Sequence, residues 1–203
     1  EIGSGLVGSE MCIRDSVDAD EEMFRQHYLR QDKYLQCGSV GAGADHVFDR
    51  RRFDFLKDLL ERWVTDKDAD VLDVGCAQGG LLKVLRANGY RKLHGLDLSP
   101  GCIAALAREP GIQAYCCLPP DLRFKVIIMS NVLEHIFDVP AFMEKVNQRL
   151  EPDGVLIIEV PDAMSYDRLF RGPFVAFDME HINHWDEAHL ISCLLYTSDA
   201  ADD

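Results

Sequence analysis

Residues 71–80 read Val71-Leu-Asp-Val-Gly-Cys-Ala-Gln-Gly-Gly80, and this stretch decides the fold. The short apolar run around Asp73 is typical of a buried strand, and the small residues after it predict a tight turn that leads into a helix. The free N–H groups of such a turn and of a helix start favour a negatively charged ligand group. Taken alone, the pattern is compatible with several nucleotide-like ligands.

From this strand onward, short apolar runs alternate with helical stretches, as is typical of βαβ units. Strands are predicted at 70–74, 92–96, 113–116, 125–129 and 155–160, and helices at 45–63, 79–88, 99–108, 139–150 and from about 186. The expected helix caps are Asp45, Asn88-Gly89, Ser99 and Asp138. The prediction is an α/β fold with a Rossmann-like, doubly wound, mostly parallel sheet and helices on both faces.

The two ends of the chain resemble translated sequencing adapters. Met11-Cys-Ile-Arg-Asp-Ser16 and Cys193-Leu-Leu-Tyr-Thr-Ser198 back-translate to DNA strings that are reverse complements of each other. Such segments are excluded from fold reasoning. We therefore expect adapter-derived tails at 1–16 and 193–203 and one natural domain at 17–192, with an N-terminal helical segment (17–65) and a Rossmann-like core (66–192). The sheet is then expected to be incomplete at its C-terminal end.

The 203-residue chain has a formal net charge of −14, of which the expected tails contribute −5. An acidic chain lacks an electrostatic footprint for nucleic acid or an anionic membrane, so we expect neither as a partner, and a small molecule or another protein instead. The five cysteines outside the tails lack the spacing of a zinc site. Without a signal pattern or a membrane-spanning run, a cytoplasmic location is expected. The oligomeric state is not indicated.

A second element narrows the choice of ligand. Leu93-His-Gly-Leu-Asp97 is predicted to end the next strand in a carboxylate about twenty residues past the turn, where it can accept the ribose hydroxyls of a nucleoside. Gly75, Ala77 and Gly80 also satisfy a loose pattern for nicotinamide or flavin cofactors. Asp73 argues against that alternative, because nicotinamide-binding strands usually carry an apolar residue there.

At this point the chain resembles class I S-adenosylmethionine-dependent methyltransferases. The segment 71–79 is similar to their first motif, and Gly95-Leu-Asp-Leu-Ser99 is similar to their ribose-binding motif. Phe124-Lys-Val-Ile-Ile-Met-Ser-Asn-Val-Leu-Glu-His135 and Leu150-Glu-Pro-Asp-Gly-Val-Leu-Ile-Ile-Glu159 resemble their fourth-strand motif and fifth strand. The resemblance covers about 70–161, in order and at the family's spacing.

The resemblance implies S-adenosylmethionine as the cofactor. The residues that it implies in cofactor binding are Asp73, Gly75, Cys76, Ala77, Gln78, Gly79, Asp97, Leu98, Ser130 and Asn131. Ala77 stands where glycine is most common, and we expect the turn to accept it with a negative φ. Lys125 stands where aspartate is common, but it begins a strand far from the ligand edge. Of Cys116 and Cys117, one is expected to be buried and the other to lie near the adenine.

Three histidines are the candidate catalytic residues. Glu180-His-Ile-Asn-His-Trp185 resembles a segment of small-molecule and sugar methyltransferases in which the first histidine is a candidate base, so His181 is preferred over His184 and His135. Tyr166, Phe170, Phe174, Phe177 and Trp185 either wall an apolar substrate pocket or pack a lid onto the sheet. No metal site is expected, because His181, His184 and His189 lack a convincing geometry for one.

The leading hypothesis is transfer of a methyl group from S-adenosylmethionine to an oxygen or carbon of a small-molecule or sugar-linked acceptor. A domain that binds the cofactor without catalysis and a nicotinamide-dependent oxidoreductase are the alternatives. A third possibility is that this truncated chain is itself inactive. The identity of the acceptor does not follow from the fold, because pocket residues come from variable segments.

Overall fold

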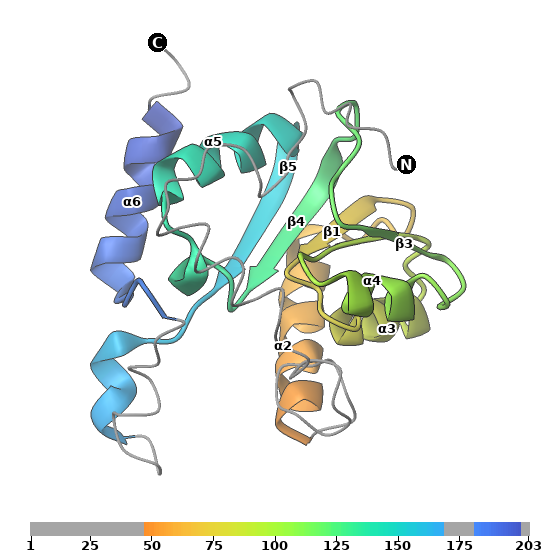
Figure 1. Ribbon diagram of the computed structural model, residues 1–203, viewed down its shortest axis with the longest axis horizontal. Coiled ribbons are helices and arrows are strands. Elements are labelled where there is room, and N and C mark those ends of the chain that lie inside the picture. The colour runs from red at the N-terminus through yellow and green to blue at the C-terminus, as the bar shows by residue number, and fades with distance from the viewer. Residues whose placement is uncertain (1–46, 169–180, 200–203) are drawn as a thin grey trace, which may run out of the picture.

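The computed structural model describes residues 47–168 and 181–199 of the chain (Figure 1). The strands are β1 (Asp70–Val74), β2 (Lys92–Leu96), β3 (Ile112–Tyr115), β4 (Phe124–Ser130) and β5 (Leu150–Glu159). The helices are α2 (Val47–Trp63), α3 (Gly80–Ala87), α4 (Pro100–Leu106), α5 (Val139–Arg149) and α6 (Glu187–Asp199), with the short 3-10 helices η2 (Leu133–His135) and η3 (Ala163–Arg168).

The five strands form one parallel sheet in the order β3-β2-β1-β4-β5. The chain builds outward from β1 to β3 on one side and then crosses back to add β4 and β5 on the other. The strand order therefore reverses between β1 and β4. In open α/β sheets, ligands bind outside the carboxyl ends of the strands at such a reversal. The predicted fold class is confirmed.

Apolar side chains cover both faces of the sheet. On one face, Leu56, Leu60, Leu82 and Leu85 from α2 and α3 pack against strand residues such as Val71. On the other face, α5 and α6 cover a separate cluster that includes Ile127 and Met129 of β4. Figure 1 shows α5 and α6 together beside β5, away from α2, α3 and α4. This two-faced burial explains why the central strands read as nearly continuous apolar runs.

The caps expected from the sequence lie where the helices begin and end. Ser99 Oγ accepts a hydrogen bond from Cys102 N at 3.3 Å, and Asp138 Oδ1 accepts one from Ala141 N at 3.0 Å. Asn88 is the C-cap of α3, and Gly89 follows with a φ of 92°. Asp45 lies outside the described residues, as does the segment 17–44 expected to lead into the domain.

The strand β5 begins five residues earlier than the sequence predicts. β5 starts at Leu150 instead of Val155, because Leu150 pairs with Phe124 before a register shift between Phe124 and Val126. Near its start, Lys125 Nζ donates to Asp153 O at 2.6 Å, at the edge of the sheet opposite the ligand edge. Lys125 is thus placed in a structural contact, far from the carboxyl ends of the strands.

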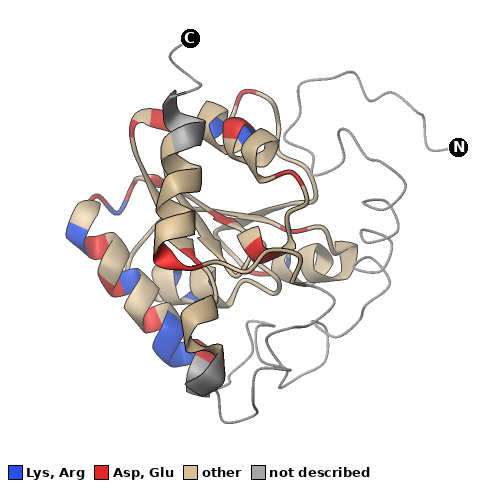
Figure 2. Ribbon diagram, turned by 90° about the vertical axis from the view of Figure 1, so that its left-hand side faces the viewer, with Lys and Arg blue, Asp and Glu red and all other residues tan. Residues whose placement is uncertain are grey.

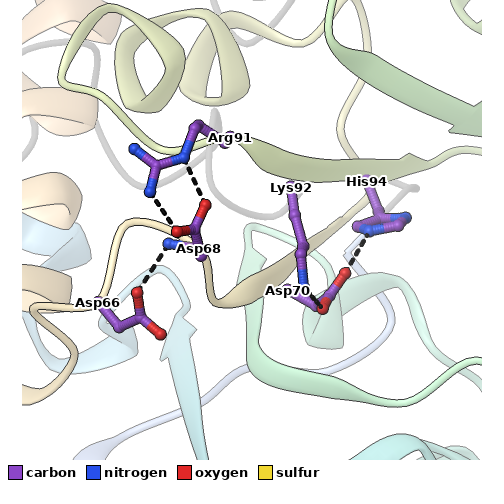
Figure 3. A network of polar contacts seen from close by, with 6 residues as sticks. All are labelled: Asp66, Asp68, Asp70, Arg91, Lys92 and His94. Carbon is purple, nitrogen blue, oxygen red and sulfur yellow. Dashed lines mark hydrogen bonds and ion pairs between the residues drawn. The ribbon is translucent and has the colours of Figure 1, made fainter.

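A polar network joins the amino-terminal ends of β1 and β2 (Figure 3). Arg91 forms a bidentate ion pair with Asp68, and Lys92 Nζ donates to Asp70 Oδ2 at 3.1 Å. His94 Nε2 lies 3.0 Å from Asp70 Oδ1, with its ring buried against Tyr115 and Phe124. These contacts link β1 to β2 at the amino-terminal edge of the sheet, opposite the carboxyl ends of the strands.

α6 begins close to the position predicted for a helix start, and Asp186 Oδ1 accepts from His189 N at 2.8 Å. The helix continues past Ser192, and Cys193 and Leu194 pack against the core on its face of the sheet. Figure 2 shows acidic and basic residues together on part of the helical surface, whereas α6 carries no lysine or arginine. Among the residues described, no helix has the length and apolar character needed to cross a membrane.

Candidate functional site

The loop after β1 is a tight turn with three left-handed residues. Gly75, Ala77 and Gly79 have φ values of 72°, 44° and 74°. Gly75 N and Cys76 N both donate to Leu96 O, and Gly79 N donates to Cys76 O at 2.7 Å. The negative φ expected for Ala77 is wrong, because the turn needs a left-handed residue between the two glycines to close. Small side chains along this loop leave its backbone accessible to a ligand.

Close packing beneath the loop explains the glycine that ends it. A Cβ atom on Gly79 would lie 2.3 Å from Leu106 Cδ1 of α4, closer than real contacts allow. Gly79 is also the N-cap of α3, so the loop passes directly into the helix. The N–H groups at this helix start face the carboxyl edge of the sheet, where they favour an anionic group.

Asp97 couples the end of β2 to the same loop. Its Oδ2 accepts a hydrogen bond from Ala77 N, and its Oδ1 accepts one from Ser99 N, both at 2.8 Å. Burial raises the pKa of Asp97, while the two backbone donors oppose that change. Each carboxylate oxygen keeps a second lone pair. The side chain is thus held in one orientation and can still accept ligand hydroxyls.

Asp73 is buried directly below the turn, with only 4% of its surface exposed. Burial, assisted by the nearby charge of Asp97, raises the pKa of Asp73 to about 8, and Arg52 partly opposes this. The other loop residues implied in cofactor binding line the same edge: Cys76 is buried, and Gln78 and Leu98 are half-buried. Two carboxyl groups therefore meet at the carboxyl ends of β1 and β2.

The tip of β4 is fastened to β5. Ser130 Oγ donates to the Glu159 carboxylate, and Asn131 N donates to Glu159 O at 2.8 Å. Asn131 has a φ of 55°, a conformation that asparagine tolerates better than most residues. Arg52 Nε lies 3.8 Å from Glu159 Oε2. Ser130 and Asn131 are thereby held at the strand reversal, beside the loop that follows β1.

His135 and His181 come together just past this tip. Their ring centroids are 4.9 Å apart and the rings meet at 67°. Glu134 lies beside them with its side chain 1% exposed, and its Oε1 is 3.8 Å from His135 Nε2. Among the residues that the structure describes, neither carboxylate oxygen of Glu134 has a hydrogen-bond partner. Burial raises the pKa of this carboxyl to about 7.

Backbone contacts bring His181 to this position across a long stretch of chain. Ile182 N and Asn183 N both donate to Glu134 O, at 2.8 and 3.0 Å. Asn183 Nδ2 donates to Leu133 O and Ile136 O, at 3.2 and 2.6 Å. Four hydrogen bonds thus tie the segment 181–183 to η2 and to Ile136 directly after it, and His181 lies against His135.

The structure separates the third candidate histidine from this pair. His184 Nδ1 lies 3.2 Å from the hydroxyl of Tyr166, and its ring packs edge-on against that phenol. Tyr166 and Trp185 are both buried. Phe170, Phe174, Phe177 and Glu180 lie outside the described residues. The fold therefore brings two of the three predicted catalytic histidines into contact, His135 and His181.

The cysteine prediction is wrong in one respect. Cys116 is exposed and Cys117 is half-buried, so neither thiol is fully buried; β3 ends at Tyr115 and both cysteines follow it in the loop. Leu118 fills the interior position instead. The strand was expected to end one residue later, at Cys116, and the alternation of faces fails where the strand ends.

Sequence reasoning assigned no role to Glu134, Asn183 or Arg52. Glu134 stands next to His135 in the fourth-strand motif, which was a usable signal. Asn183 lies within the segment that contains His181, but its partners are fifty residues away in sequence. Arg52 is one of three consecutive arginines on α2, and the sequence does not distinguish which of them faces the site. Its charge affects both Asp73 and Glu134.

Comparison with known proteins agrees with this geometry. Residues 48–195 match the family model of the methyltransferase domain. The ubiquinone biosynthesis O-methyltransferase of Azorhizobium caulinodans is 28% identical over 131 residues, covering 56% of this chain and 51% of that protein. A probable S-adenosylmethionine-dependent methyltransferase of Mycolicibacterium smegmatis is 28% identical over 120 residues, covering 56% and 46%. The chain spans about half the length of these curated relatives.

Solved structures show the same fold. The plantazolicin methyltransferase BpumL, in complex with a pentazolic desmethylPZN analog and SAH, aligns with a TM-score of 0.64 at 15% identity. The alignment covers 92% of this chain and 72% of that one. The family match extends over most of the chain, from α2 into α6. The chain therefore belongs to the methyltransferase domain family and has its Rossmann-like fold.

Proposed function

We propose that the chain binds S-adenosylmethionine at the carboxyl edge of the sheet and transfers its methyl group to an oxygen or carbon of a small-molecule or sugar-linked acceptor. The observation that carries the proposal is the joint placement of the loop after β1 and Asp97. Ala77 N donates to Asp97, so the turn and the carboxylate form one rigid unit. The family match and the names of the relatives support the same cofactor.

Each part of this edge has a role in the proposal. The N–H groups of the loop and of the α3 start donate hydrogen bonds to the carboxylate of the methionyl moiety. Asp97 accepts the ribose hydroxyls, and Leu98 lies beside the adenine. Ser130 and Asn131, at the strand reversal, face the reacting end of the cofactor. The cofactor itself supplies an electrophilic methyl group on a positively charged sulfur.

The chemistry then requires alignment of the acceptor and, for a hydroxyl, removal of a proton. As the bond from the acceptor atom to the methyl carbon forms, the bond from sulfur to that carbon breaks and leaves a neutral thioether. The proton of the acceptor passes to His181, which His135 and the Asn183 contacts hold in place. The O-methyltransferase relative favours an oxygen acceptor.

Calorimetry tests the cofactor assignment. The chain should bind S-adenosylhomocysteine and not a nicotinamide dinucleotide. Asp97→Asn should weaken that binding at least about tenfold, because hydrogen bonds to a charged group contribute about 1.5–3 kcal/mol each. Asp121→Asn, at an exposed position, is the matched control and should change nothing. Binding of the nicotinamide ligand in place of S-adenosylhomocysteine would refute the proposal.

Turnover tests the catalytic assignment. With a panel of phenolic, catecholic and sugar hydroxyl acceptors, formation of S-adenosylhomocysteine should be detectable for at least one acceptor. His181→Ala should then lower kcat by about 100-fold or more, in the range of general-base contributions, with the cofactor KM little changed. An unchanged kcat would remove His181 as the base. Cofactor binding without turnover on any acceptor would favour a non-catalytic binding domain.

A further inference from the structure

The cluster formed by Glu134, His135 and His181 contains an unusual group. Glu134 is a carboxyl side chain that is 1% exposed and, within residues 47–168 and 181–199, has no hydrogen bond to either oxygen. Leaving a buried polar group without a partner is destabilising, and more so when the group is charged. A native fold tolerates such a group when a ligand completes its contacts.

The neighbours of Glu134 carry atoms of the kind that bind metal ions. One such atom from each of Glu134, His135 and His181 lies within 4.8 Å of the others, and Glu134 Oε1 is 3.8 Å from His135 Nε2. Around an ion bound at about 2.0–2.2 Å, tetrahedral ligand atoms are roughly 3.3–3.6 Å apart. Side-chain shifts of about 1 Å or less would bring the three atoms to one ion.

The backbone already holds the two segments in register for this. Ile182 N and Asn183 N donate to the carbonyl of Glu134, and the Asn183 side chain bridges to Leu133 O and Ile136 O. The two imidazole rings meet at 67° instead of stacking, an arrangement that lets both direct a nitrogen toward a common point. Such preorganisation is what a metal site requires.

Local charge also favours a cation. The charge of Glu159 acts to raise the pKa of Glu134, and the positive charge of Arg52 acts to lower it. Arg52 is itself engaged with Asp49 and Glu159, at 3.6 and 3.8 Å. The buried carboxylate is therefore not neutralised by a direct contact with an arginine or lysine in the described part of the chain.

From this geometry we infer a binding site for a divalent transition-metal ion, with Glu134, His135 and His181 as its protein ligands. One carboxylate and two imidazoles suit ions such as Zn²⁺, whereas Mg²⁺ prefers an all-oxygen shell. Three protein ligands leave an open position, as in catalytic zinc sites. The sequence did not predict this set, because it placed His184 and His189 with His181 and left out Glu134.

A metal ion at this site would bear on the proposed function. The metal site itself does not depend on that function, but the consequence described next does. An acceptor hydroxyl at the open position of the ion would become more acidic, so the ion could replace a free imidazole as the means of deprotonation. A metal-bound His181 cannot also take the proton. The two roles of His181 are therefore alternatives, and metal binding by the chain decides between them.

Zn²⁺ titration of the full chain, stripped of metal beforehand, tests the inference. Calorimetry should show one Zn²⁺ per chain and much weaker binding of Mg²⁺, and Co²⁺ should produce visible d–d absorption. We expect Zn²⁺ binding to weaken by at least about tenfold in each of the variants Glu134→Gln, His135→Ala and His181→Ala. Replacing residues that only support the ligands of a metal already lowers its affinity by about 10–100-fold. His189→Ala is the matched control, because His189 is 77% exposed and paired with Asp186 outside the cluster.

The outcomes separate the inference from the proposed function. Overlapping Zn²⁺ titrations for the wild type and His181→Ala, or binding of Mg²⁺ alone, would overturn the metal site. S-adenosylhomocysteine is titrated into the same samples. Binding of Zn²⁺ without S-adenosylhomocysteine supports the metal site and contradicts the proposed function, and the reverse result contradicts the metal site only. Thermal melting of each variant verifies folding, and Glu134→Gln, which keeps the side-chain shape, stands in for any alanine variant that fails to fold.

Discussion

Asp73 illustrates how a single residue can favour function over stability. The pKa of its carboxyl, about 8 in the folded protein, is well above its ordinary value of 3.8, chiefly because of burial. Between these two values the folded state binds a proton that the unfolded state does not, so this residue's contribution to stability falls as pH rises. A buried carboxylate beneath a cofactor loop is thus costly at neutral pH unless a ligand compensates it.

Replacing Asp73 by Asn should remove this pH dependence. We expect the Tm of Asp73→Asn to rise relative to the wild type as pH increases from 5 to 8.5, because the amide has no proton to lose. Binding of S-adenosylhomocysteine should weaken at the same time. Scanning calorimetry at several pH values measures the difference in Tm. If that difference stays constant with pH, or if the exposed-site variant Asp121→Asn behaves identically, Asp73 is not the group responsible.

Ala77 poses a different problem at the same scale, because an L-residue there has a φ of 44°. The left-handed conformation costs about 1–2 kcal/mol for alanine. Glycine would relieve that strain but would lose about 0.4–1 kcal/mol in chain entropy and about 0.8 kcal/mol for the buried methyl group. The terms nearly cancel, which explains how alanine is accepted at this position.

Two substitutions check this balance. Ala77→Gly should change the free energy of unfolding by no more than about 0.5 kcal/mol. Ala77→Val should destabilise by more than about 2 kcal/mol, because a β-branched residue with positive φ is a true outlier and the site is buried. Urea unfolding of the three proteins provides the measurement. A gain of more than about 1 kcal/mol for Ala77→Gly would show that strain, not balance, dominates.

Among the elements, those marked by local signals were predicted well. The caps at Ser99 and Asp138 and the Asn88-Gly89 stop act within one helical turn, so their meaning does not depend on the rest of the fold. The start of β5 was missed because Leu150 becomes strand only by pairing with Phe124, twenty-six residues earlier in the chain. Local patterns carry no information about such pairings.

In the candidate site, too, some residues could be predicted from local sequence patterns and others could not. Asp73 lies in a predictable strand and Asp97 directly follows one, so both could be placed from the sequence. The φ of Ala77 could not, since it depends on closure of the turn against Asp97 and Leu96. The Glu134 cluster could not either, because it forms only when the segment 181–183 docks on η2. Contacts between distant segments are therefore the part of the site that only the structure supplies.

That docked segment offers a prediction at the scale of an element. Asn183→Ala removes both side-chain donors to Leu133 O and Ile136 O, at a cost of about 1–2 kcal/mol, or a fall in Tm of about 2–8 °C. Because His181 is held by this segment, Zn²⁺ affinity and turnover should fall as well. Asn88→Ala, which removes one exposed bond to Val84 O at the end of α3, is the control. It should affect stability without changing either site property.

Across the whole molecule, charges are sorted between the two edges of the sheet. The amino-terminal edge carries paired charges, including Asp68 with Arg91 and Asp70 with Lys92 (Figure 3). The carboxyl edge carries buried carboxyl groups, with Arg52 as the basic side chain that acts on both Asp73 and Glu134. A net charge of −14 adds general repulsion that grows as carboxyl groups ionise. The ligand edge is therefore the less stable one in the absence of a ligand.

This distribution predicts where the ligand-free protein is most stable. The raised pKa values of Asp73 and Asp97 make stability fall as pH rises toward 8. The lowered pKa of buried His94 acts in the opposite direction, since below its ordinary value of 6.5 the unfolded state gains a proton that the folded state does not. Some surface carboxyl groups have lowered pKa values, such as Glu109 beside Lys83 and Arg86. Their stabilising contribution is lost only in more acidic solution, where they become protonated. By linkage, Asp73 lowers stability progressively up to about pH 8, whereas His94 acts only below its ordinary pKa, so stability should be higher on the acidic side of neutrality and fall between pH 6 and 8.

Thermal melting from pH 6 to 8.5 should therefore show a steady fall in Tm. Asp73→Asn should make this fall shallower, because it removes one of the carboxyl groups that lose a proton in this range. His94→Gln keeps much of the ring's size and polarity without a titrating nitrogen, and it should change the pH dependence only below about pH 6.5, the ordinary pKa of histidine. A Tm that stays level or rises between pH 6 and 8.5 would mean that the buried carboxyl groups at the ligand edge do not govern the stability of the fold.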